Sequence, residues 1–268
     1  MKTKTILSAC GAALGLLAIG SPALAVTNGV PDGEGHPHVG LLIFDVDGVP
    51  AWRCSGTLIS PTVMVTAGHC TDGTSGGRVW FESDVGAGRP GNGYPVGGGT
   101  SIELTAIHTH PQYLPGAFYA YDVGVVILSE PVVLDTYGVL PPLGLLDGLA
   151  TRRGLQDQLF NPVGYGLQSV KPTEQRALVR YTGDVMLVDV SGTNGIPRGT
   201  SVVFSSNPGQ KATGGTCFGD SGGPVFWDGS NVMVAVVSYA LNQNCKGTSG
   251  GYRLDQLDDQ DFINSFLP

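Results

Sequence analysis

The residues best suited to chemistry form a glycine-rich segment, 219–224, with the sequence Gly-Asp-Ser-Gly-Gly-Pro. A serine hydroxyl becomes a nucleophile when a base removes its proton and backbone N–H groups stabilise the developing oxyanion. Gly219 permits a turn that aims its own N–H and that of Ser221 at one point. Ordinary turns also use glycine, aspartate and serine. We interpret Ser221 as the nucleophile.

The base that such a serine needs is best supplied by His69. It lies in the segment 65–70, Val-Thr-Ala-Gly-His-Cys, at the end of an apolar run and beside a cysteine that could fix it in place. A general base requires rigid placement. We therefore expect His69 to take the proton of Ser221.

The other four histidines form two pairs, each separated by one residue: His36 with His38, and His108 with His110. We expect the first pair in a surface loop. The second has a spacing that two metal ligands could use on a strand, but no third ligand is evident. We predict no metal site.

An acidic residue must hold the imidazole in one tautomer, and Asp122 is the candidate. It opens the apolar run 122–128, Asp-Val-Gly-Val-Val-Ile-Leu. A carboxylate that enters a buried region needs a partner, and the ring N–H of His69 would supply one. The competing interpretation is an aspartate at a strand edge or turn.

Short β-rich runs separated by Gly-rich turns must position these residues. A first series and a second series of such runs flank the Pro-containing segment 129–153, which we interpret as a linker. Many short strands of this kind favour closed antiparallel barrels and an all-β fold. Only 257–267, near the end, has a helical pattern. The expected strands are 39–44, 56–59, 63–67, 78–81, 102–108 and 123–128, then 159–163, 179–190, 201–205, 223–227 and 232–239.

The composition excludes some functions. The chain of 268 residues has a formal charge of −8, a pI near 4.9, 42 glycines and 18 prolines. Binding to nucleic acid requires a basic face that displaces counterions, so we expect no nucleic-acid partner.

Residues 1–25 have the pattern of a secretory signal peptide. Lys2 and Lys4 precede an apolar stretch, and 23–25 is Ala-Leu-Ala, a small-x-small cleavage signal. The stretch is too short to span a membrane. A lipoprotein-like box ends at Cys10, but most of the apolar run follows it, which argues against lipidation. We expect cleavage after Ala25 and secretion.

Export decides how the remaining cysteines are interpreted. Cys54, Cys70, Cys217 and Cys245 are an even number, which predicts two disulfides outside the cytosol. Three pairings are possible, and the order of the residues does not choose among them. A zinc site is excluded because there is no Cys-x-x-Cys pair.

Together, the motifs around His69, Asp122 and Ser221, in that order, resemble the chymotrypsin/trypsin family of serine peptidases. The likeness extends over nearly all of 26–268. Gly164-Tyr165-Gly166 is similar to a Gly-aromatic-Gly turn in the family's second barrel. Val237-Ser238-Tyr239 is similar to its substrate-binding segment, where the serine also hydrogen-bonds the catalytic aspartate.

The resemblance implies two six-stranded antiparallel barrels, 26–145 with the linker and 146–268 with a terminal helix, and an active site in the cleft between them. It also implies a monomer that needs no cofactor and acts on protein or peptide substrates. The implied oxyanion donors are the N–H groups of Gly219 and Ser221. The implied disulfides are Cys54–Cys70 and Cys217–Cys245. Relatives bind calcium in a loop that here carries Glu82 and Asp84, too few carboxylates to predict an ion.

The resemblance further implies an activating ion pair between a freed N-terminal amine and the aspartate before the nucleophile. Val26-Thr27-Asn28-Gly29 is similar to such a terminus, and Asp220 is the matching carboxylate. We expect removal of residues 1–25 to generate this amine without a separate activation step.

Specificity follows from the same likeness. Gly215 matches the floor of the specificity pocket, where an aspartate would select Lys or Arg. A glycine there predicts cleavage after uncharged apolar residues. Ala240 stands where glycine is frequent and could narrow the entrance. The expected substrate-binding residues are Gly215, Thr216, Phe218, Ser238, Tyr239, Ala240 and Gly250, with Gly251 beside them.

Two other classes of function compete with a peptidase. One is a catalytically inactive binding protein on the same fold, which should lack a residue of the triad; none is missing here. The other is an esterase with the same triad. An α/β-hydrolase esterase would require the chain order serine, acid, histidine, which this chain does not have.

Overall fold

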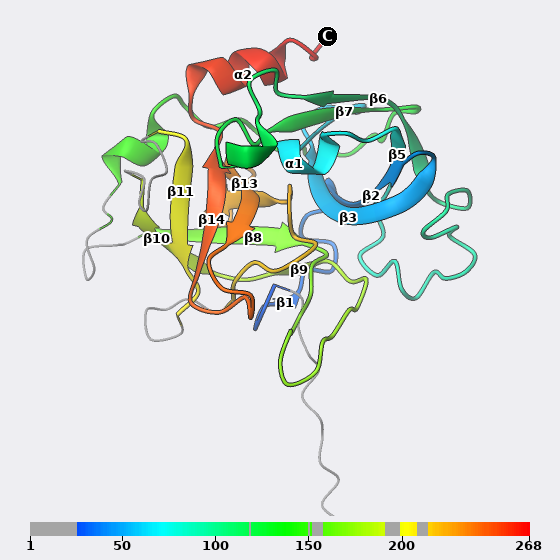
Figure 1. Cartoon of the computed structure of the whole chain (residues 1–268), viewed down its shortest axis with the longest axis horizontal. Helices are drawn as coiled ribbons and strands as arrows, with labels where there is room; N and C mark the ends of the chain where they lie inside the picture. Colours follow the sequence, from blue (N-terminus) through cyan, green and yellow to red (C-terminus); the bar gives the residue numbers. More distant parts are fainter. Residues whose placement is uncertain (1–25, 118, 150, 152–157, 191–198, 208–213) are drawn as a thin grey trace, which may run out of the picture.

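Six strands from the first half of the chain close into an antiparallel barrel, in the order β2-β3-β4-β7-β6-β5 (Figure 1). The computed structural model describes residues 26–117, 119–149, 151, 158–190, 199–207 and 214–268; the expected signal peptide lies outside them. The strands are β2 (Val39–Val46), β3 (Val49–Leu58), β4 (Val63–Thr66), β5 (Gly76–Trp80), β6 (Ile102–Thr109) and β7 (Gly124–Leu128).

Six strands from the second half form the other barrel. They follow the order β8-β10-β11-β14-β13-β12, and β12 pairs with β8 to close the ring. The strands are β8 (Leu159–Gly164), β10 (Val185–Asp189), β11 (Ser201–Ser205), β12 (Pro224–Trp227), β13 (Met233–Ala240) and β14 (Thr248–Arg253). The predicted architecture of two six-stranded antiparallel barrels with a short terminal helix is confirmed.

The remaining elements are short. Strand β1 (Val30–Pro31) pairs with β9 (Tyr181–Thr182) and joins the N-terminal segment to the second barrel. Helix α2 (Leu257–Asn264) is the last element of the chain and lies along the top of the molecule in Figure 1, next to one end of β6. The other helical turns are α1 (Gly68–Thr71) and the 3-10 turns η1 (Pro115–Ala117) and η2 (Leu145–Gly148).

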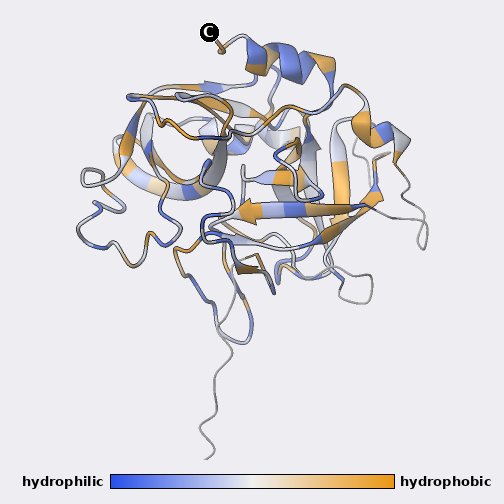
Figure 2. Ribbon diagram, turned by 180° about the vertical axis from the view of Figure 1, so that it is seen from behind, coloured by the Kyte–Doolittle hydropathy of each residue, from blue (hydrophilic) through white to orange (hydrophobic). Residues whose placement is uncertain are grey.

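The three largest of the five apolar clusters among the described residues form the core of the molecule. Leu42, Phe44 and other fully buried residues fill the first barrel, and Phe160 with its neighbours fills the second. A third cluster contains residues of both barrels, among them Val65 and Tyr252. Figure 2 shows apolar residues along the strands of both barrels. Because burial of apolar area is the main favourable term in folding, the third cluster fixes how the two barrels face each other.

A fully buried arginine joins the barrels as well. Arg180 donates from Nε to Asp32 Oδ2 at 2.8 Å, and its Nη1 donates to the carbonyl oxygens of Val39 and Phe81 and to the hydroxyl of Tyr165. A buried charge is tolerated when it is paired and its donors are satisfied. Arg180 therefore links the N-terminal segment, the first barrel and the second.

Two disulfides are formed, Cys54–Cys70 and Cys217–Cys245, in the pairing that the family resemblance implied. The first joins β3 to α1. The second joins the segment before Ser221 to the loop that leads into β14. Each disulfide therefore restrains a segment next to a residue of the expected triad.

Candidate active site

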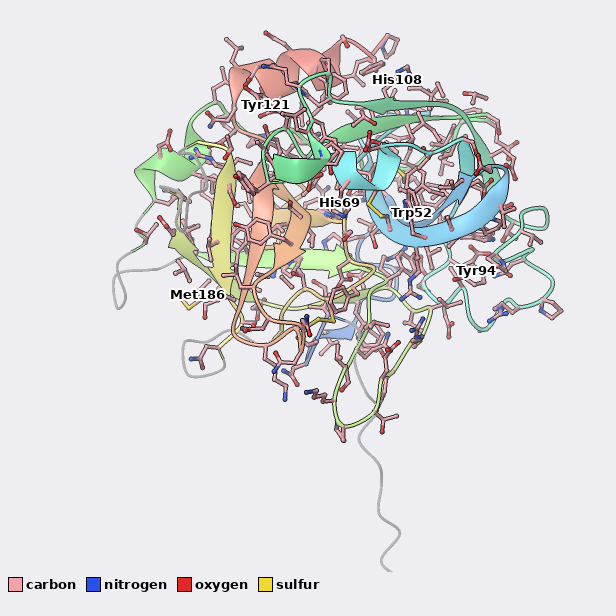
Figure 3. All side chains as sticks on the ribbon, viewed as in Figure 1. Trp52, His69, Tyr94, His108, Tyr121 and Met186 are labelled. Carbon is pink, nitrogen blue, oxygen red and sulfur yellow. A yellow bond between two sulfur atoms is a disulfide. The ribbon has the colours of Figure 1, made fainter. Side chains whose placement is uncertain are left out.

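The candidate base lies on the one-turn helix α1, directly after β4. His69 is held there by the adjacent disulfide of Cys70 and by its own backbone N–H, which donates to Asp122 Oδ1 at 2.7 Å. The indole of Trp52 donates to the Cys70 carbonyl oxygen at 2.9 Å. Figure 3 shows His69 and Trp52 close together between the barrels. The backbone that carries the imidazole is thus held by Asp122 and by Trp52.

The candidate acid, Asp122, precedes β7 and is fully buried. Its carboxylate accepts from His69 Nδ1, with distances of 2.9 Å to Oδ2 and 3.1 Å to Oδ1. Ser238, on β13 of the second barrel, donates its hydroxyl to Asp122 Oδ2 at 2.5 Å. Burial of a carboxylate is compensated here by three donors, one of them from the opposite barrel.

Burial and the carboxylate of Asp122 together set the pKa of the His69 imidazole. Burial lowers the pKa of His69, but the charge of Asp122 and its hydrogen bond outweigh burial and raise the pKa above its ordinary value of 6.5. A carboxylate bonded to Nδ1 keeps the proton there and leaves Nε2 as the basic nitrogen. His69 can therefore accept a proton from a nucleophile at Nε2.

The candidate nucleophile is held by the close approach of its loop to the first barrel. Gly222 has φ +76°, and a Cβ placed on it would lie 2.0 Å from Thr66 Oγ1. The Ser221 carbonyl oxygen accepts from the backbone N–H of Ser55 at 2.8 Å. Because Thr66 lies three residues before His69 in the chain, this approach brings Ser221 and His69 to the same hollow.

The backbone of the same loop is arranged to bind an oxyanion. The N–H of Leu167 donates to the Phe218 carbonyl oxygen at 2.8 Å. In a trans peptide the C=O and the following N–H point in opposite directions. The N–H of Gly219 therefore points away from Leu167, as a donor of an oxyanion hole requires. Gly219 has φ +98°, which favours glycine.

Asp220, beside the nucleophile, is buried behind this loop. Its carboxylate accepts from the backbone N–H groups of Gly166 at 2.8 Å and Cys217 at 2.9 Å. Burial raises the pKa of Asp220 to about 6, although these hydrogen bonds and the charge of Arg53 oppose the rise. A second cation beside Asp220 would oppose the effect of burial more strongly and lower the pKa of its carboxyl below this value.

Two connected hollows meet at Ser221. The first, which we call the acyl-side hollow, has a volume of about 280 Å³. It is lined by His69, Ser221 and the segments 216–218 and 237–240. The second, which we call the central hollow, has a volume of about 370 Å³ and shares His69, Phe218 and Ser221 with the first. It continues over Gly219 toward Trp52 and Arg53. A substrate chain has room on both sides of the nucleophile.

The predicted substrate-binding residues divide between two environments. Thr216, Phe218, Ser238, Tyr239 and Ala240 line the acyl-side hollow. Gly215 instead pairs with Thr27 and faces Ser206, and Gly250 lies under the Tyr239 ring, where a Cβ would be 2.0 Å from Cζ. Neither glycine is among the described residues that line the hollow.

The expectation that His36 and His38 lie in a surface loop is wrong for His38, which is fully buried. The His36 ring stacks on Phe226, and the His38 ring packs edge-on against it.

The other two histidines and the cysteines near the site also have other contacts. The His108 ring packs on Phe266, two residues after the end of α2, and the His110 ring stacks on Tyr121. The sulfurs of Cys54 and Cys70 lie with a His69 ring nitrogen inside 4.8 Å, but they are bonded to each other and offer no thiolate to a metal.

Sequence analysis missed two residues that contact the nucleophile loop. Ser55 donates its hydroxyl to the Gly219 carbonyl oxygen at 2.9 Å and accepts from the Tyr165 N–H at 3.0 Å. Arg53 packs against Gly219, since a Cβ there would lie 2.9 Å from its Nε. In the sequence, Arg53 and Ser55 flank Cys54, which was predicted to form a disulfide near His69. This position could have indicated that both residues lie close to the site.

Two barrels that present a buried aspartate, a histidine and a serine to a shared cleft define the class of chymotrypsin-fold serine peptidases. A sequence model of the family described as Trypsin matches residues 31–254. The chain belongs to the trypsin family of serine peptidases and is, like its relatives, a serine endopeptidase.

Similar proteins are spread over distant organisms. Brachyurin of Leptuca pugilator is 28% identical over 214 residues, covering 78% of this chain and 84% of that protein. A trypsin of Saccharopolyspora erythraea is 28% identical over 217 residues, covering 74% and 80%. The solved structure of HL collagenase, 19% identical, covers 90% of this chain and 97% of its own with a TM-score of 0.69, which supports the fold.

No helix among the described residues is long and apolar enough to cross a membrane.

Proposed function

We propose that this chain is a secreted peptidase that hydrolyses peptide bonds after uncharged apolar residues. The single observation that carries the proposal is the shared hollow, in which Ser221 lies beside a histidine that Asp122 already holds in the required tautomer.

In the proposed reaction the Ser221 hydroxyl attacks a peptide carbonyl while His69 Nε2 takes its proton. The N–H groups of Gly219 and Ser221 bind the oxyanion. His69 then protonates the leaving amine, and the same imidazole activates the water that hydrolyses the acyl-enzyme. Asp122 stabilises the imidazolium formed in each step.

The preference for uncharged residues rests on the lining of the acyl-side hollow. Among the described residues that line it, His69 is the only one with an ionisable group in the range of neutral pH. An Asp or Glu there would be needed to select Lys or Arg. The aromatic faces of Phe218 and Tyr239 and the methyl of Ala240 suit an apolar side chain.

An activating ion pair between Val26 and Asp220 is part of the proposal. The Val26 side chain is fully buried beside Gly183 and Gly214, and Thr27 pairs with Gly215 by two backbone hydrogen bonds of 2.7 and 3.0 Å. Asp220 has only backbone N–H donors at hydrogen-bond distance in the described part of the chain. An ammonium at Val26 would complete its pairing.

The extracellular setting is supported by the two disulfides, which persist in oxidising compartments. With cleavage after Ala25, the new terminus would be Val26. The division into units 26–145 and 146–268 is also part of the proposal; within the linking segment 129–153, residues 150, 152 and 153 lie outside the described residues.

The experiment is a peptide-library digest by the secreted protein and by Ser221→Ala, with product mapping and N-terminal sequencing of the active form. We expect cleavage after uncharged apolar residues, no cleavage by Ser221→Ala, and a terminus at Val26. Dominant cleavage after Lys or Arg would contradict the specificity. A terminus well downstream of Val26, or full activity with an added N-terminal tag, would contradict the activating pair.

A further inference from the structure

From the placement of one unpaired arginine we infer that Arg53 determines specificity on the leaving-group side. It would select substrates with an acidic side chain within two residues after the cleaved bond. This inference rests on the proposed peptidase function and adds a substrate class to it.

The first observation is the position of Arg53 relative to the nucleophile. Its side chain lines the central hollow together with Ser221 and Gly219, and its Nε and Nη2 would lie 2.9 and 3.1 Å from a Cβ on Gly219. The guanidinium therefore lies on the backbone of the oxyanion glycine. A group bound there is within a residue or two of the bond being cut.

The second observation is the direction in which the hollows continue. The central hollow opens over Trp52, Arg53 and Gly219 into an outer cleft of about 480 Å³, whose lining also includes Tyr94 and Leu167. The acyl-side hollow lies on the other side of Ser221. A substrate whose acyl part occupies the acyl-side hollow must send its leaving part across Arg53. Figure 3 shows Tyr94 on the outer side of Trp52.

The third observation is the charge of the outer cleft. Among the described residues, Arg53 forms no ion pair and no side-chain hydrogen bond, and it is partly buried. The other charged residues that line the cleft are Glu174 and Arg176, which pair with each other. Arg53 thus leaves one uncompensated positive charge in the cleft, apart from its weaker interaction with the buried Asp220.

Chemistry then identifies the preferred substrate group. A guanidinium presents N–H donors in a planar fork that matches a carboxylate, and such a charge-assisted bond is stronger than a neutral one. A lysine or arginine at the same substrate position would meet like charge. An acidic side chain on the leaving segment satisfies the donors of Arg53.

The test compares peptides that differ only in Glu, Gln or Lys at the first or second position after the cleaved bond. Their affinities are measured by fluorescence anisotropy on the Ser221→Ala protein, which retains the substrate, and kcat/KM is measured on the active protein. We expect the affinity and the kcat/KM of the Glu peptide to exceed those of the Gln peptide by about 5- to 20-fold at low salt, in at least one of the two positions. The ratio should shrink as salt is raised.

Variants assign the effect to one residue. Arg53→Gln should bring the ratio of the affinities for the Glu and Gln peptides close to 1. Arg53→Glu should bind the Lys peptide more tightly than the other two. The matched control is the double variant Glu174→Gln with Arg176→Gln, since it removes an arginine of the same cleft together with its partner and leaves the net charge of the cleft unchanged; its ratio should change by less than about twofold. The ratio is taken within each variant, so altered folding or turnover cancels.

Two outcomes would overturn the inference: equal affinity for Glu and Gln peptides at both positions, or a Glu preference that survives Arg53→Gln. Failure of the peptidase function is a separate result, an active form that cuts no peptide. The affinity ratio on Ser221→Ala still decides the role of Arg53 in that case.

Discussion

The hydroxyl of Ser238, on the second barrel, donates a 2.5 Å hydrogen bond to Asp122 Oδ2, on the first barrel. The same oxygen accepts from His69 Nδ1 at 2.9 Å. The orientation of the imidazole therefore depends on a contact across the interface of the barrels, and loss of either donor leaves a buried carboxylate less well satisfied.

Ser238→Ala tests this contact. A hydrogen bond to a charged group contributes about 1.5–3 kcal/mol, which corresponds to a loss of about 10- to 100-fold in kcat/KM. Ser265→Ala, an exposed serine on the terminal helix end, is the control and should retain full activity. Unchanged kinetics in Ser238→Ala would show that the bond does not position Asp122.

Asp122→Asn tests the tautomer and the acidity of His69. We expect kcat to fall by about 10⁴-fold, because the amide favours the wrong tautomer. The base must be neutral, so activity is lost as the pH falls through its pKa. Asp122 holds the pKa of His69 above 6.5, so the residual activity should persist to lower pH in the variant. A pH profile with an unchanged acidic limb would contradict this assignment.

Gly222→Ala tests the close approach of the nucleophile loop to the first barrel. Gly48 has the same φ of +76° but no neighbour within 4 Å of an added Cβ, so Gly48→Ala measures the backbone strain alone. We expect Gly48→Ala to cost about 1–2 kcal/mol of stability and to keep activity. Gly222→Ala should cost about 1–3 kcal/mol more and reduce kcat/KM at least 100-fold. Equal behaviour of the two variants in urea unfolding and kinetics would remove the clash as an explanation.

Asp259→Asn tests a buried carboxyl of the terminal helix. Asp259 Oδ1 accepts from the Tyr252 hydroxyl at 2.8 Å, and Oδ2 is buried with no partner among the described residues. Burial, with repulsion from Asp258 and Asp255, raises the pKa of Asp259 to about 7. The folded state therefore holds a proton that the unfolded state releases, and stability falls as the pH rises from about 4 to 7.

Because asparagine does not titrate, Asp259→Asn should be more stable than the unmodified protein at pH 8, by roughly 1–4 kcal/mol, and similar to it at pH 4. Urea unfolding at both pH values measures the difference. An exposed aspartate of the same helix gives the control, Asp261→Asn, expected within about 0.5 kcal/mol at either pH. Parallel stability curves for the Asp259 variant and the unmodified protein would refute the shift.

The barrels could be predicted because most strands carry apolar runs. Strand β11 spans Ser201–Ser205, as predicted. Strand β14, Thr248–Arg253, was missed because Thr-Ser-Gly-Gly has no apolar alternation; its pairing with β11 and β13 holds it in the sheet. The single strand expected over 179–190 is two, β9 and β10, separated at Gly183, where the backbone packs on Gly214.

The triad could be proposed from local motifs, whereas the residues that support it could not. Arg180 gains its role from Asp32, Val39 and Tyr165, all more than ten residues away in the chain. Arg53 likewise depends on Gly219, which only the fold brings to it. Long-range contacts of this kind leave no periodic signal in a single sequence.

Covalent labelling by a fluorophosphonate tests the central claim most directly. Intact mass and peptide mapping of the processed protein should show a single phosphonyl adduct on Ser221, reduced strongly in Asp122→Asn and absent in Ser221→Ala. An adduct that persists in Ser221→Ala, or no adduct on a folded protein whose N-terminus is Val26, would contradict the assignment of Ser221 as the nucleophile.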